Sequence, residues 1–145
     1  MTLTEVTLQL RDELASNAEV DSWCVEKFGK QAKFYAGFNV RKPPKDSELP
    51  TVILIPDETD VDESGRRTFT IGLVWAVSSS ESVTDGNRVT LAGCLLADEF
   101  GELLMGALSN FTNSFRITAS GYNLPWNSLQ FPTFAGEATL TISEW

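Results

Sequence analysis

Apolar residues recur every four positions near the start of the chain, at Val6, Leu10 and Leu14. That spacing places the three side chains in one stripe, as an amphipathic helix requires. Thr2 and Glu5 precede the stripe at the spacing of a capping box, in which each side chain bonds to the backbone N–H of the other residue. The pattern therefore predicts a first helix that begins after Thr2 and ends near Ser16.

A shorter second helix is expected from Val20 to Phe28, and the pattern then changes to that of strands. Three segments rich in aromatic and β-branched residues follow, namely Lys33 to Val40, Thr51 to Ile55 and Arg67 to Val77. The second segment is continuously apolar between Pro50 and Pro56, which favours a short buried strand that ends at the prolines. The third alternates apolar with polar or small residues, so one of its faces should be buried. The acidic stretch Asp57 to Gly65 is expected to be the loop that connects these two strands.

The longest helical pattern runs from Arg88 to Ser109, after an expected polar loop from Ser78 to Asn87. Leu91 and Leu95 widen its apolar stripe, which indicates contact on two sides. Those contacts are either two core surfaces or one core surface and a neighbouring subunit. Two closing strands are expected at Phe115 to Ala119 and at Phe134 to Ile142.

These elements occur in the order helix, short helix, three strands, long helix, two strands. Strands grouped apart from helices are typical of the α+β class. We therefore expect one domain over residues 1–145, with a mostly antiparallel sheet of about five strands and both the N-terminal helix and the long central helix packed on it.

The charge and hydropathy of the chain exclude several classes of function. Twenty acidic and eleven basic residues give a net charge of −9, and no basic run exceeds the pairs Arg41-Lys42 and Arg66-Arg67. Because sequence-independent nucleic-acid binding depends on neutralising phosphates, direct binding of DNA or RNA is not expected. No apolar run approaches the roughly 20 residues of a membrane span, and residues 1–10 lack the basic and apolar regions of a signal peptide. A cytosolic protein without a membrane partner is expected.

Catalytic chemistry has little support. The sequence has no histidine, which removes Ser-His-Asp and Cys-His catalysis and histidine-bound zinc. Phosphate-binding glycine loops are also absent, so neither an enzyme nor a cofactor is expected. Cys24 and Cys94 have no metal-binding spacing and are expected to be small, buried side chains in a reducing compartment. An enzyme that uses Cys94 is disfavoured, because no cationic neighbour would lower the pKa of its thiol.

One acidic stretch begins like a calcium loop, with Asp60, Asp62 and Ser64 at alternate positions before Gly65. The twelfth position, which should be a bidentate glutamate, is Ile71 in an expected strand. The sequence therefore predicts a solvated acidic loop and no metal site.

Large apolar side chains crowd the segment from Tyr122 to Pro132, which is otherwise rich in turn residues. Loops normally lie on the surface and are polar. This one either folds back over its own core or forms a subunit interface, where aromatic anchors are common. The candidate interface residues come from this segment, from position 145 and from the long helix. They are Tyr122, Leu124, Trp126, Leu129, Phe131, Trp145, Leu91 and Leu95.

The order of the elements, in a chain of 145 residues, resembles that of the tail terminator (tail completion) proteins of long-tailed bacteriophages. The shared features are an N-terminal amphipathic helix, a hairpin with a polar tip, a long central helix and two closing strands. The run from Phe131 to Ile142 is similar to the last strand of those proteins. The resemblance implies a homo-hexameric ring that caps the tail tube and joins it to the head, while DNA passes through the lumen without being gripped. It also implies tail-tube and head–tail connector proteins as partners, and a location in the virion tail or neck after assembly in the host cytoplasm.

A second class of function also fits the charge. A monomeric acidic binding or inhibitor module could engage a basic protein through the acidic residues between positions 57 and 63. The two hypotheses differ in their oligomeric state.

Overall fold

The computed structural model describes residues 1–37, 41–111, 115–125 and 131–144. Within these ranges the elements are α1 (Leu3–Ala15), α2 (Ala18–Phe28), β1 (Lys33–Ala36), a short 3-10 helix (Asp46–Glu48), β2 (Thr51–Val61), β3 (Arg67–Ser78), β4 (Ser82–Asp85), β5 (Arg88–Leu91), α3 (Ala92–Ser109), β6 (Phe115–Asn123) and β7 (Thr133–Glu144).

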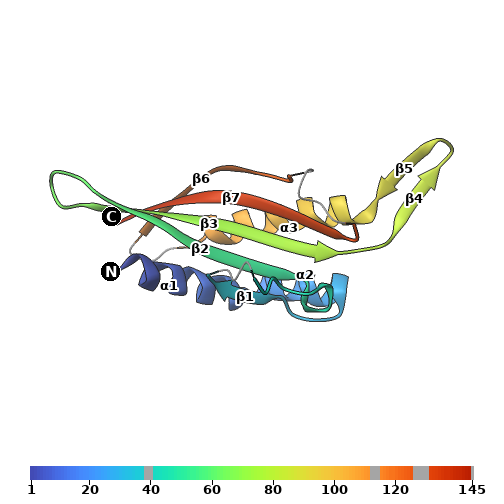
Figure 1. Cartoon of the computed structure of the whole chain (residues 1–145), viewed down its shortest axis with the longest axis horizontal. Helices are drawn as coiled ribbons and strands as arrows, with labels where there is room; N and C mark the ends of the chain where they lie inside the picture. Colours follow the sequence, from blue (N-terminus) through green and yellow to red (C-terminus); the bar gives the residue numbers. More distant parts are fainter. Residues whose placement is uncertain (38–40, 112–114, 126–130, 145) are drawn as a thin grey trace.

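Five of these strands form one sheet in the order β1-β2-β3-β7-β6. The β1–β2 pair is parallel, and the other pairs in this sheet are antiparallel. Helix α1 packs on β1 and β2, whereas α3 packs on β3, β6 and β7 (Figure 1). The expected α+β fold, with its N-terminal and central helices, is confirmed.

The central strand β3 provides much of the core. Its alternate side chains are fully buried towards the helices, as the sequence pattern predicts: Phe69, Ile71, Leu73, Trp75 and Val77. The residues between them are only half-buried. We call the face of the sheet that these intervening residues occupy the outer face.

Small residues allow α3 to lie close to the sheet. The indole Nε1 of Trp75 donates a hydrogen bond to the backbone oxygen of Ala97 in α3, at 2.8 Å. A Cβ atom added at Gly101 would lie 2.6 Å from the Trp75 ring, and one added at Gly136 in β7 would lie 2.3 Å from it. The two glycines therefore leave the space that the indole fills.

The predicted start of the long helix is wrong. Residues 88–91 form strand β5, which pairs with β4 in a separate two-stranded sheet, and α3 begins only at Ala92. Gly86 takes a φ of +60° in the two-residue Gly86-Asn87 turn, which suits a tight hairpin. The β-branched residues Val89 and Thr90 also favour a strand, and this local preference prevails over the helical spacing of the apolar residues.

The predicted ends of two strands are also wrong. Strand β2 continues beyond Pro56 to Val61, and its register with β3 shifts between Pro56 and Glu58. A proline is tolerated at such an irregularity because the regular ladder is interrupted there. Strand β6 extends to Asn123, so Tyr122 lies in a strand and not in a loop.

Candidate interaction surfaces

A two-stranded hairpin projects from one end of the molecule. It consists of β4 and β5, residues 82–91, which we call the arm, and Figure 1 shows it extending beyond the body along the long axis. Every residue of both strands is exposed. Val83 and Val89 are 64% and 63% exposed, although valine is usually buried. An isolated two-stranded hairpin is marginally stable in water, so the arm is suited to packing against another surface.

Two of the predicted interface residues lie beside the arm. Leu91 is the last residue of β5 and is 38% exposed, and Leu95 follows it in the first turn of α3 with 58% of its surface exposed. Because side chains alternate along a strand, Val89 and Leu91 occupy the same face of the arm. The structure thus brings these two leucines together with a valine at the base of the arm.

Tyr122 and Leu124 instead contact the core of their own chain. The Tyr122 ring packs edge-on against Trp75, at 5.5 Å between ring centroids. Its hydroxyl group lies 2.5 Å from the Asp98 carboxylate and 2.9 Å from that of Glu102, both in α3. The contact with Asp98, followed by burial and the contact with Glu102, raises the pKa of Tyr122. Tyr122 and Leu124 therefore fold back over the core of their own chain, which is the first of the two alternatives for this segment.

Phe131 is 61% exposed and touches the ring of Phe134 edge-on. The other candidate aromatic and apolar anchors, Trp126, Leu129 and Trp145, lie outside the described residues.

The acidic stretch at positions 57–63 lies at the opposite end of the molecule from the arm. There the distal parts of β2 and β3 form a second projection, residues 57–67, which we call the finger (Figure 1). All eleven residues are exposed. Glu58 and Asp60 pair with Thr70 and Thr68, so they lie on the outer face of the sheet. Most of the acidic residues expected in a loop are therefore held on a strand.

The basic side chains of the finger are directed to the chain ends. Arg66 donates a hydrogen bond to the Glu144 backbone oxygen, and Arg67 donates one to that of Met1, both at 2.9 Å. These contacts leave the acidic residues of the finger without an ion pair among the described side chains.

The turn of the finger is stabilised by hydrogen bonds to the side chain of Asp62. Asp62 accepts hydrogen bonds from the Ser64 hydroxyl at 2.6 Å and from the Arg66 backbone N–H at 2.9 Å, and these bonds lower its pKa. Ile71 is buried in β3. Among the described residues, no three His, Cys, Asp or Glu side chains gather closely enough to hold a metal ion.

A groove of about 630 Å³ lies on the outer face, between the end of β1, the start of β2 and residues 42–48. Its lining combines apolar and basic residues: Tyr35, Ile53, Pro43, Pro44, Lys42 and Lys45. Leu49, which follows the 3-10 helix, is buried and anchors this segment to the sheet. A hydrogen bond of 2.8 Å from the Thr133 hydroxyl to Asp46 ties the same segment to β7.

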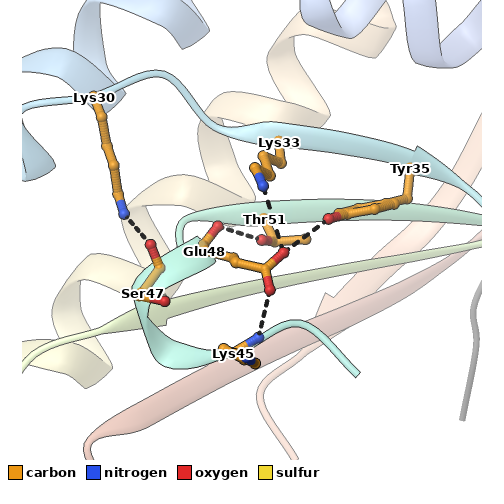
Figure 2. A network of polar contacts seen from close by, with 7 residues as sticks. All are labelled: Lys30, Lys33, Tyr35, Lys45, Ser47, Glu48 and Thr51. Atoms are coloured by element: carbon orange, nitrogen blue, oxygen red, sulfur yellow. Dashed lines mark hydrogen bonds and ion pairs between the residues drawn. The ribbon is translucent and has the colours of Figure 1, made fainter. Parts of the chain in front are cut away.

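The one carboxylate in the lining of the groove already has partners. Glu48 accepts hydrogen bonds from the Tyr35 hydroxyl at 3.2 Å and from the Lys45 backbone N–H at 3.4 Å, and Lys33 lies 3.5 Å away (Figure 2). The backbone bond and the tyrosine bond lower the pKa of Glu48, so it stays ionised. Lys42 and Lys45 are exposed at the rim.

This basic region was missed in the sequence because only consecutive basic residues were considered. Six of the eleven bases fall between residues 27 and 45, a stretch with no acidic residue: Lys27, Lys30, Lys33, Arg41, Lys42 and Lys45. In a chain with a net charge of −9, this local excess of basic residues is the feature of the sequence that indicates a basic surface.

The two cysteines differ in their exposure to solvent. Cys24 is buried as expected, and its burial raises the pKa of its thiol to about 11. Cys94, expected to be buried, is exposed because it lies in the first turn of α3, where the helix leaves the body towards the arm. Both thiols are free.

No protein-family model matches this chain, and no curated protein matches its sequence. None of the helices in the described ranges is long and apolar enough to cross a membrane.

Proposed function

We propose that this protein is a structural subunit that assembles with copies of itself into a ring. The exposed arm is the observation that carries the proposal. It places Val83 and Val89 in solvent on a hairpin that has no packed layer of its own. Association with a neighbouring copy would remove these side chains from water, and arms of this kind suit subunit contacts.

Within this class, the proposed role is that of a tail terminator of a long-tailed bacteriophage. The order of the elements supports it, as does the acidic balance of the chain. A hexameric ring would cap the tail tube and join it to the head, in contact with tail-tube and head–tail connector proteins. Its net charge of −9 per subunit would let DNA pass through the lumen without binding. The protein would then reside in the virion tail or neck after assembly in the host cytoplasm.

Light scattering after gel filtration, together with negative-stain images, tests the proposal. The wild-type protein should form a closed ring, and Val89→Asp in the arm should shift it to monomer. Val25→Asp is the matched control, because Val25 is an apolar residue of α2 that is 45% exposed. It should leave the ring intact.

Circular dichroism of both variants checks that the body still folds. A wild-type protein that stays monomeric at all concentrations, even with tail-tube protein added, would rule out this function.

The acidic finger favours a second candidate. A monomeric module could present Glu58 and Asp60 to a basic protein, with an affinity that falls as salt is added. The same light-scattering experiment separates the two candidates, because this one requires a stable monomer.

A further inference from the structure

Two oppositely charged surfaces lie beside different parts of β2. The groove includes Ile53 near the start of β2, whereas the acidic finger lies where β2 ends at Val61. Glu58 and Asp60 follow Ile53 by five and seven residue steps, which at ~3.3 Å per step is about 17 and 23 Å. Both features are on the outer face of the sheet.

The finger cannot reach the groove of its own chain. Strand β2 runs continuously between them and is paired with β3 along its length, apart from the shift after Pro56. The two charged surfaces can therefore meet only between different copies. Contact between opposite ends of two identical chains is heterologous, and heterologous contacts generate rings when the rotation between copies closes.

The two surfaces also match in chemistry. The groove combines Lys42 and Lys45, both exposed, with apolar residues that include Pro43 and Ile53. The finger presents the carboxylates of Glu58 and Asp60. The carboxylates of one copy can thus face the lysines of another.

From this complementarity we infer that the finger of one copy docks in the groove of the next, forming the contact that repeats around the ring. The inference rests on the proposed function and adds to it the identity of the two contacting surfaces. It also assigns Lys42 and Lys45 to subunit recognition, although the chain as a whole is acidic.

Charge reversal tests the contact. Glu58→Lys/Asp60→Lys gives a chain with a basic finger and a basic groove, and Lys42→Glu/Lys45→Glu gives a chain in which both are acidic. Each should be monomeric, with association weakened at least about a hundredfold, because like charges would face each other. An equimolar mixture of the two should assemble again, since each finger now finds a groove of opposite charge.

Matched controls carry the same change in net charge elsewhere. Glu13→Lys/Glu19→Lys and Arg11→Glu/Lys27→Glu alter exposed or partly exposed residues of α1 and α2, and both should assemble as the wild type does. Circular dichroism checks folding, and Glu58→Gln/Asp60→Asn replaces the first variant if reversal impairs it.

The possible outcomes separate the two proposals. If the wild type assembles and the reversed chains assemble equally well alone, the finger–groove contact is wrong while the ring survives. If the reversed chains stay monomeric when mixed, the contact is also wrong. A wild-type protein that never assembles would refute the ring itself.

Discussion

At the scale of single residues, Trp75 determines how closely α3 can approach the sheet. Its ring is fully buried, and its Nε1–H group is fixed by the bond to Ala97. The indole therefore has little freedom to move when a neighbour grows. Gly136 leaves space directly against this ring, whereas Gly72, in β3, has only ordinary contacts at 3.6 Å or more.

Replacing Gly136 by alanine should destabilise the protein by about 1–3 kcal/mol, because the new methyl group would overlap the fixed indole. Gly72→Ala introduces the same methyl group into a strand with room for it, so the free energy of unfolding should stay the same or rise slightly. Urea unfolding monitored by tryptophan fluorescence measures both. Equal effects of the two substitutions would show that the space around Trp75 is not limiting.

At the scale of elements, α1 begins with the capping box that the sequence predicts. Thr2 accepts a hydrogen bond from the Glu5 backbone N–H at 3.2 Å, and Glu5 accepts one from the Thr2 backbone N–H at 3.1 Å. Beyond the cap, Val6, Leu10 and Leu14 are all buried. The cap therefore fixes where a core-forming helix begins.

Removing the cap with Thr2→Ala should cost about 1 kcal/mol, equivalent to about 3 °C in Tm. Thr4→Ala is the control, since Thr4 is exposed within the same first turn. It should have no effect or be slightly stabilising, because alanine is the better helix former. Thermal unfolding followed by circular dichroism gives both values, and an equal loss for Thr4→Ala would contradict a specific role for the cap.

Elements with strong local signals could be predicted from the sequence. The cap and stripe predict α1, and the alternation of apolar residues predicts the buried face of β3. The parallel pairing of β1 with β2 could not be predicted, because it depends on contacts between segments distant in the sequence. The extension of β2 past Pro56 is not predictable from the local pattern, because a proline normally marks the end of a strand.

The candidate surfaces were only partly predictable. Leu91 and Leu95 were named from the helical pattern, but the arm next to them was not, although the Gly86-Asn87 turn between β-branched residues was a usable hairpin signal. Tyr122 is predicted to lie in a loop because a glycine interrupts the strand pattern just before it. In the structure Gly121, with a φ of +119°, lies in a bulge, and the strand continues beyond it. The groove depends on how residues 42–49 cross the sheet, which tertiary contacts decide.

At the scale of the whole molecule, the chain is elongated, with the arm and the finger at opposite ends (Figure 1). Each exposes side chains that the body does not cover. Two surfaces at opposite ends suit an assembly in which every copy contacts two neighbours.

Assembly should therefore make thermal stability depend on concentration. Binding between folded copies stabilises the folded state by mass action, so a tenfold increase in protein should raise Tm by about 2–4 °C. The monomeric Val89→Asp variant should show no such shift. Differential scanning fluorimetry over a range of concentrations measures this, and a wild-type Tm that does not change would count against assembly.

The position of β7 inside the sheet, between β3 and β6, has a consequence for synthesis of the chain. Strand β7 pairs with β3 on one side and with β6 on the other, so Phe69 and Ile71 have no neighbouring strand at that edge until Leu140 and Ile142 have been translated. During elongation, β2 and β3 can form a hairpin whose apolar face and free edge remain open to other nascent chains. The newly made protein is therefore most prone to aggregation just before β7 leaves the ribosome.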